Sequence, residues 1–143
     1  MKITLTDKQI KDIAEEIEGG MVLYYNLITG EIKSLPNFDT FGYDHDLWNE
    51  EIDEIEENYR NYFKFEGFDS HESFRIMADF IYTVEDERMQ EKLFDTLKMH
   101  HPFRNFKDIV EYSEYRQKWF DYKSMRYIQE VKVQIELHNN KFS

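Results

Sequence analysis

Cysteine is absent from this chain of 143 residues. Its absence excludes disulfide bonds, thiolate metal sites and a cysteine nucleophile, so a metal would have to bind through His and carboxylates. Glycine is scarce, with five residues, and these form no G-x-S-x-G, Walker or dinucleotide-binding pattern. The sequence therefore lacks the usual phosphate-cradling loops and the usual setting of a serine nucleophile.

Long apolar runs are also missing. The first residues become polar and helical before any apolar run of signal-peptide length, and no stretch approaches the length of a membrane span. We therefore expect a cytoplasmic protein with no membrane segment. The length predicts a single domain, residues 1–143, which buries roughly 70% of the surface of its unfolded chain. An aromatic content of 17% predicts a packed core despite the many charges.

The charges are unevenly placed. Residues 1–97 carry 24 acidic and 9 basic side chains, whereas residues 98–143 carry 6 and 9. These balances of −15 and +3 predict charged faces that meet within the molecule or across an oligomer. The overall charge of −12 disfavours non-specific binding to nucleic acid.

The first 68 residues contain signals for helices and strands in turn. Thr6 and Gln9 have the spacing of a capping box before a helical apolar stripe, which Gly19-Gly20 ends. β-forming residues flank the turn signal Thr29-Gly30, and strict alternation returns near Phe63. The expected elements are a helix at 7–18, strands at 21–26 and 31–35, an acidic helix at 46–58 and a strand at 59–68.

Residues 69–143 predict four helices. Asp69 and Glu72 form a second capping box, Thr83 with Asp86 is expected to cap the next helix, and Ser113 the last. The expected ranges are 69–82, 85–98, a helix from about 103, and 114–138. The predicted fold class is α+β, a small antiparallel three-stranded sheet packed against a mainly helical C-terminal half, with about six helices in all.

An acidic interval without Lys or Arg runs from Ser34 to Tyr59. A calcium loop counted from Asp44 would place Trp48 and Asn49 where an oxygen ligand and a glycine are needed, so the pattern fails. A solvated acidic helix face fits better, because an apolar stripe persists beneath the charges. The five histidines form no H-E-x-x-H and no spaced pair on one helix face, so we expect no metal and no cofactor.

Four motifs, in this order, resemble the bacterial uncharacterised protein family 0158. They are Asn26-Leu27-Ile28-Thr29-Gly30-Glu31, Asp69 to Met77, Pro102-Phe103-Arg104-Asn105-Phe106-Lys107-Asp108, and Trp119-Phe120-Asp121-Tyr122-Lys123. The family tends to have Asp at the first position of the first motif, and more often Phe at the fourth position of the last. The resemblance implies a compact cytoplasmic domain and no particular reaction, cofactor or substrate.

One stretch concentrates basic and aromatic side chains near a helix start. It offers a surface on which Arg would hold an acidic peptide or small anion by bidentate contact and Trp by stacking. The same rings have the spacing of a packed core, and local ion pairing is the alternative role of the charges. The candidate binding residues are Arg75, Arg104, Lys107, Asp108, Trp119 and Lys123.

Two functional hypotheses remain. The preferred one is a non-enzymatic protein-interaction or regulatory module that uses oppositely charged faces, with a protein partner or a second copy. The alternative is a small-anion-binding protein or enzyme with a pocket near Arg104, in which Asp108 would act as general base. The missing motifs favour a protein that is not an enzyme, and a carboxylate pair assembled in space stays open because 30 acids offer many combinations.

Overall fold

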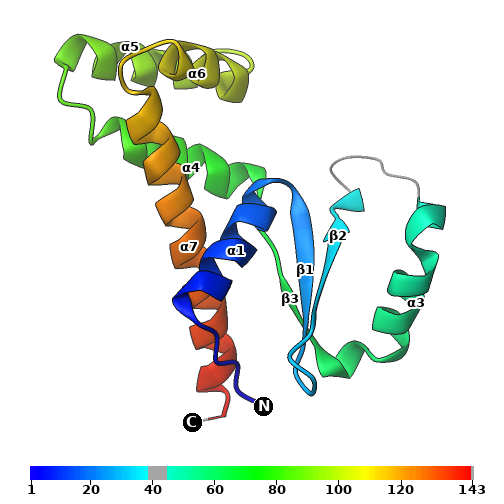
Figure 1. Cartoon of the computed structure of the whole chain (residues 1–143). Coiled ribbons are helices and arrows are strands. Elements are labelled where there is room, and N and C mark those ends of the chain that lie inside the picture. The colour runs from blue at the N-terminus through cyan, green and yellow to red at the C-terminus, as the bar shows by residue number, and fades with distance from the viewer. Residues whose placement is uncertain (39–44, 143) are drawn as a thin grey trace. The chain divides into compact units, whose positions relative to one another are not determined.

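The computed structural model describes residues 1–38 and 45–142 (Figure 1). The chain forms two compact units. The first, called the sheet unit below, comprises Met1–Gly67 and Tyr127–Ser143. The second, the helical unit, comprises Phe68–Arg126. The last helix contributes residues to both.

Six α-helices and three strands are present in the described residues, and the sheet is antiparallel. The predicted α+β class is therefore confirmed. The elements are α1 Asp7–Glu18, β1 Met21–Asn26, β2 Ile32–Pro36, the 3-10 turn η1 His45–Trp48, α3 Asn49–Glu57, the 3-10 turn η2 Tyr59–Asn61, β3 Tyr62–Phe65, α4 Ser70–Ile81, α5 Glu87–Leu97, α6 Pro102–Glu111 and α7 Arg116–Asn140.

Helix α1 begins at the predicted capping box. Thr6 Oγ1 accepts a hydrogen bond from Gln9 N at 3.1 Å, and Gln9 Oε1 accepts one from Thr6 N at 2.9 Å. These bonds satisfy two backbone donors that a helix start leaves without partners. The helix ends before Gly20, whose φ of 96° is the left-handed conformation that glycine adopts without steric cost.

The sheet has the strand order β2-β1-β3 and helices on both faces (Figure 1). On one face, Leu23 and Phe65 join a buried cluster with the apolar stripe of α1 and with Val131 of α7. On the other face lies α3, whose Ile55 is buried. Each strand therefore alternates its side chains between two covered faces.

Strand β3 is shorter than the predicted strand at 59–68. Its first predicted residues form η2 instead, where Asn61 N donates to Asn58 O at 2.8 Å. Beyond Phe65, Gly67 passes so close to α1 that an added Cβ would lie 2.7 Å from Ile17 Cγ2. Alternation alone does not reveal these contacts, which limit the strand to Tyr62–Phe65.

The starts of α5 and α7 differ from the prediction. Thr83 does not cap α5, because its hydroxyl donates to Phe80 O at 2.7 Å within the turn that follows α4. Asp86 is the cap instead, and its carboxylate accepts from the first backbone N–H groups of α5. Ser113 Oγ accepts from Tyr115 N at 3.1 Å, which stabilises the turn before α7 rather than the first residue of that helix.

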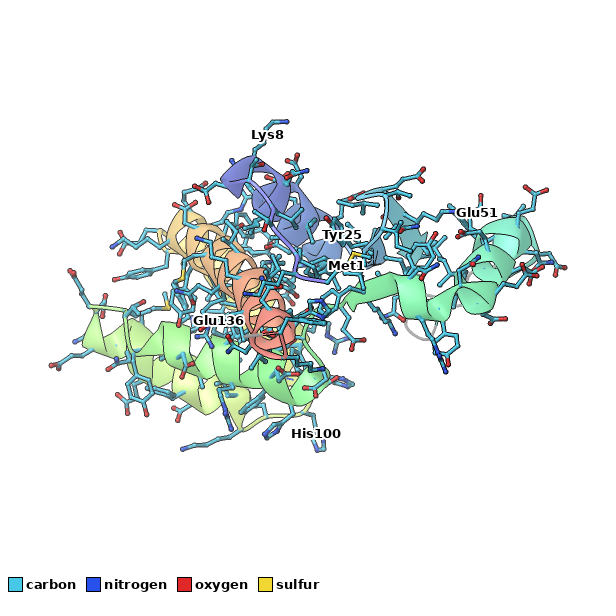
Figure 2. All side chains as sticks on the ribbon, turned by 90° about the horizontal axis from the view of Figure 1, so that it is seen from below. Met1, Lys8, Tyr25, Glu51, His100 and Glu136 are labelled. Atoms are coloured by element: carbon cyan, nitrogen blue, oxygen red, sulfur yellow. The ribbon has the colours of Figure 1, made fainter. Side chains whose placement is uncertain are left out.

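The helix expected from about 103 is present, and α6 begins at Pro102. His100 lies in the four-residue connection between α5 and α6 (Figure 2). His101 adopts a φ of 55°, consistent with the bias of a residue before proline against the right-handed helical region. Asn105 Nδ2 donates to His100 O at 2.8 Å, so the connection is tied to the first turn of α6.

No helix within residues 1–38 and 45–142 is both long and apolar enough to cross a membrane.

Candidate functional site

Trp119, one of the candidate binding residues, belongs to the core of the helical unit. It is 6% exposed, and its ring lies 5.1 Å from that of Phe80 and 5.0 Å from that of Phe106 between centroids. Phe80 and Phe106 are 1% exposed and contact each other edge to face. These distances are those of aromatic pairs that stabilise a core. The Trp119 ring is therefore packed against neighbouring rings in the core.

Lys123 lies one turn further along α7, close to Trp119. Its Nζ is 5.6 Å from the Trp119 ring centroid and 5.5 Å from that of Phe120. Arg116 lies over the same Phe120 ring at 5.1 Å. These are cation–π contacts, and they form a basic and aromatic stripe on the first turns of α7.

The remaining basic candidates lie on separate helices. Arg75 is exposed on α4, and Arg104 and Lys107 are exposed on α6. None of the three takes part in an ion pair within the described part of the chain. The structure thus brings Trp119 and Lys123 together but records no contact that joins these three cations to them.

Asp108, the acidic candidate, lines a surface groove between α5 and α6. The two helices are joined by a short connection and lie side by side (Figure 1). The groove has a volume of about 600 Å³. We call it the α5–α6 groove, and its lining residues are Arg88, Glu91, Lys92, Asp95, Thr96, Met99, Asn105, Asp108 and Ile109.

The groove carries both signs of charge. Its α5 wall presents Arg88, Glu91, Lys92 and Asp95, which alternate in sign and share one helix face by their spacing. Asp108 adds a third carboxylate from α6. Three carboxylates against two cations make this a poor site for a small anion. Sequence reasoning found Asp108 but not the α5 wall, because nothing in the sequence specified which face of α5 would meet α6.

A partly exposed ion pair links α7 to α4 within the helical unit. Arg126 donates to Asp79 Oδ2 at 2.9 Å and to the Tyr122 hydroxyl at 2.8 Å. Burial by itself would lower the pKa of Arg126, but the hydrogen bonds to Asp79 and Tyr122 outweigh it, so this pKa is raised. The guanidinium therefore stays charged and acts as a packing link between two helices.

A second polar cluster, which the sequence did not reveal, lies between α3 and the sheet. Glu54 accepts a hydrogen bond from the Tyr62 hydroxyl, and Lys33 Nζ lies 3.1 Å from the same carboxylate oxygen. The Tyr62 bond, and then the Lys33 bond, lower the pKa of Glu54. Burial, followed by the bond to Glu54, raises the pKa of Tyr62. The acidic helix is thus anchored by one of the carboxylates that were expected to be solvated.

No group of three or more His, Asp or Glu side chains is arranged to hold a metal ion in residues 1–38 and 45–142. Asp44, from which the calcium loop was counted, lies outside the described residues.

These features define a mainly helical α+β protein with a grooved helical unit. The chain belongs to the uncharacterised protein family UPF0158, which matches residues 6–143. Neither a curated protein nor a solved structure gave a match.

The stretches that carried the resemblance have structural roles. Asn26 Oδ1 accepts from Ile28 N at 2.9 Å and Thr29 N at 3.1 Å, which closes the hairpin turn. Asp69 caps α4, and Phe106 is a core residue of α6. These residues contribute to the fold, whereas Asn105 and Asp108 of the third motif line the α5–α6 groove.

Proposed function

We propose that the protein is a non-enzymatic protein-interaction module that binds a partner segment in the α5–α6 groove. The observation that supports this is the lining of the groove, which combines apolar side chains with charges of both signs along α5. Its apolar lining includes Ile109 and Met99, which is 58% exposed. Exposed methionine adapts to varied apolar partners.

The residues that line the α5–α6 groove indicate the chemistry of the bound segment. A helix laid in a groove presents apolar residues every three or four positions to the floor and polar residues to the rim. The alternation of Arg88, Glu91, Lys92 and Asp95 selects a partner helix whose facing charges alternate in the opposite order. We therefore propose an amphipathic helical segment of mixed charge as the bound element.

The distribution of charge supports an electrostatic contribution to partner choice. The residues of the sheet unit include 18 acidic and 8 basic side chains, and those of the helical unit include 12 and 10. The sheet unit repels acidic surfaces, whereas the helical unit is nearly balanced. Binding through the helical unit should therefore weaken moderately as salt screens the rim contacts.

The cytoplasm is the proposed location. A chain without cysteine has no need of an oxidising compartment. The net charge of −12 supports a protein partner over nucleic acid.

The alternative function is binding of a small anion near Arg104. Its support is the exposed position of Arg104 and Lys107 within the first turns of α6. Against it, neither residue lines the α5–α6 groove, and Trp119 is buried in the core. Thermal shift with phosphorylated and carboxylate metabolites tests this alternative, which requires stabilisation that Arg104→Ala abolishes.

Crosslinking followed by affinity purification tests the preferred function. The groove variant combines Arg88→Glu with Asp108→Lys, and the control combines Arg104→Glu with Glu114→Lys, so both keep the net charge. We expect a protein recovered by the wild type and the control but lost with the groove variant, and direct titration of that purified protein should reproduce the difference. Equal recovery by all three proteins would contradict the proposal.

A further inference from the structure

Strand β2 presents backbone groups at the outer edge of the sheet. Asn26 N donates to Glu31 O at 2.8 Å, which places Glu31 among the residues that bond to β1. Because antiparallel strands alternate bonded and outward-facing residues, the backbone groups of Ile32, Ser34 and Pro36 face outward. Ile32 and Ser34 offer both an N–H and a carbonyl, whereas Pro36 offers only its carbonyl. In the described part of the chain no strand pairs with this edge.

The opposite edge of the sheet is partly closed. At the end of β3, Gln134 Nε2 donates to Glu66 O at 2.8 Å, and Gln134 Oε1 accepts from Glu66 N at 3.4 Å. A side chain of α7 thus takes the place of a neighbouring strand there. Proteins commonly protect sheet edges in this way, so the contrast with β2 indicates an edge available for pairing.

A pocket of about 280 Å³ lies beside β2, between that strand and α1. Its apolar lining comes from Ile13, Leu23 and Ile32, and its polar lining includes the carboxylates of Asp12 and Glu16. Lys8 pairs with Asp12 at 3.6 Å, but its side chain is 87% exposed and extends from α1 into solvent (Figure 2). Such an exposed pair is weak, so Asp12 stays available to another cation.

Ser34 contributes an unusual polar atom to the same pocket. Its Oγ is buried and has no hydrogen-bond partner among the described residues. Buried hydroxyls nearly always have a hydrogen-bond partner, because a hydroxyl that is removed from water and gains no new hydrogen bond raises the free energy of the fold. Ser34 is the middle one of the three residues with outward-facing backbone groups, and its side chain lies on the α1 face of the sheet beside that edge.

We propose that the outer edge of β2 binds an extended basic segment of a partner protein as an added antiparallel strand. A Lys or Arg opposite Ser34 places its aliphatic part against Ile13 and Ile32, and its charged end beside Asp12 and Glu16. Ser34 Oγ then accepts a hydrogen bond from that charged end. Main-chain bonds supply affinity in this mode, and the pocket supplies selectivity.

A basic partner fits this edge better than a second copy of the chain. Pairing β2 with its own copy would bring the two α1 helices, each with Asp12 and Glu16, to the same face of a joined sheet. Like charges at such a junction repel, and each copy carries a net charge of −12. The proposed surface is independent of the α5–α6 groove.

Fluorescence anisotropy with synthetic peptides tests the proposal on the unmodified full chain. The probe is a labelled peptide of alternating Thr and Val with one central Lys. Methylating the backbone nitrogen of that Lys removes the N–H that faces β2, whereas methylating its neighbour does not. We expect the first methylation to abolish binding and the second to leave it unchanged, and exchange of Lys for Glu to abolish binding. Equal binding of the two methylated peptides, or no binding of the unmodified one, overturns the proposal.

Matched variants test whether the peptide contacts the carboxylates of the pocket beside β2. Asp12→Asn with Glu16→Gln should weaken peptide binding by about three- to tenfold at low salt, which corresponds to two partly exposed charge contacts. Glu15→Gln with Glu56→Gln removes the same charge elsewhere and should leave binding unchanged, as should the groove variant at Arg88 and Asp108. Equal weakening of peptide binding by both charge variants contradicts a basic partner at this edge. So does a free protein that sediments as a dimer and that the peptide dissociates.

Discussion

The hydroxyl of Tyr62 donates to the carboxylate of Glu54, so the edge strand β3 is hydrogen-bonded to α3, the helix on the sheet face opposite α1. Lys33, on the strand at the opposite edge, lies 3.1 Å from the same carboxylate oxygen. One acidic side chain of α3 therefore contacts both edge strands. This arrangement explains why a helix of nine residues with mostly acidic side chains stays on the sheet.

The pKa of Glu54 predicts how this anchor depends on pH. Because the hydrogen bonds from Tyr62 and Lys33 hold the folded-state pKa of Glu54 below the ordinary value of 4.5, the carboxylate stabilises the fold fully above that pH. The contribution is lost as the pH falls through the lower, folded-state pKa. Glu54→Gln should therefore reduce stability at neutral pH, and its difference from the wild type should shrink in acid.

Urea unfolding midpoints measured from neutral to acidic pH check this prediction. Glu50→Gln, on the same helix, is the control, and its difference in stability from the wild type should not shrink comparably in acid. A Glu54→Gln difference that stays constant over the whole pH range would show that the charge of Glu54 does not stabilise the fold.

Local signals in the sequence predicted most of the secondary structure. The capping boxes at Thr6 and Asp69 and the turn after Asn26 depend on residues within a few positions of each other, so their spacing was sufficient. Helix propensity and apolar spacing located the cores of the helices for the same reason.

Contacts between distant segments account for what the sequence did not reveal. The third strand was predicted too long because η2 occupies its expected start and Gly67 lies against Ile17 beyond its end. Of the candidate site, Lys123 beside Trp119 follows from helical spacing, but the groove beside Asp108 depends on which face of α5 packs against α6. The buried hydroxyl of Ser34 likewise becomes visible only when α1 covers the sheet.

Two substitutions distinguish the cap of α5 from the residue predicted to be its cap. Asp86→Ala should lower the free energy of unfolding by about 1 kcal/mol, because the carboxylate accepts from Arg88 N at 2.9 Å and Met89 N at 3.3 Å. Thr83→Ala should leave the start of α5 intact and remove only the bond to Phe80 O. Hydrogen exchange of the first amides of α5 separates the two effects, and faster exchange in Thr83→Ala than in Asp86→Ala would contradict the assignment.

Removal of a hydroxyl should have opposite effects at Ser34 and Ser113. Ser34→Ala deletes a buried oxygen with no partner among the described residues and should raise the free energy of unfolding by about 1 kcal/mol. Ser113→Ala deletes an oxygen that donates to Val110 O at 2.7 Å and accepts from Tyr115 N, and should lower it by about the same amount. Chemical denaturation of both variants checks the signs. Destabilisation by Ser34→Ala would indicate that its hydroxyl already has a partner.

Trp119 allows a direct comparison between a core role and a binding role. Trp119→Ala should cost about 3–5 kcal/mol of stability, because the ring packs against Phe80 and Phe106 and is 6% exposed. Trp119→Phe keeps an aromatic ring in the cluster and should cost clearly less. Lys123→Ala, which removes only the exposed partner of the ring, should cost less than about 1 kcal/mol. Thermal and chemical unfolding give this order directly. A Trp119→Ala protein as stable as the wild type would mean that the ring does not support the core and would reopen a binding role for it.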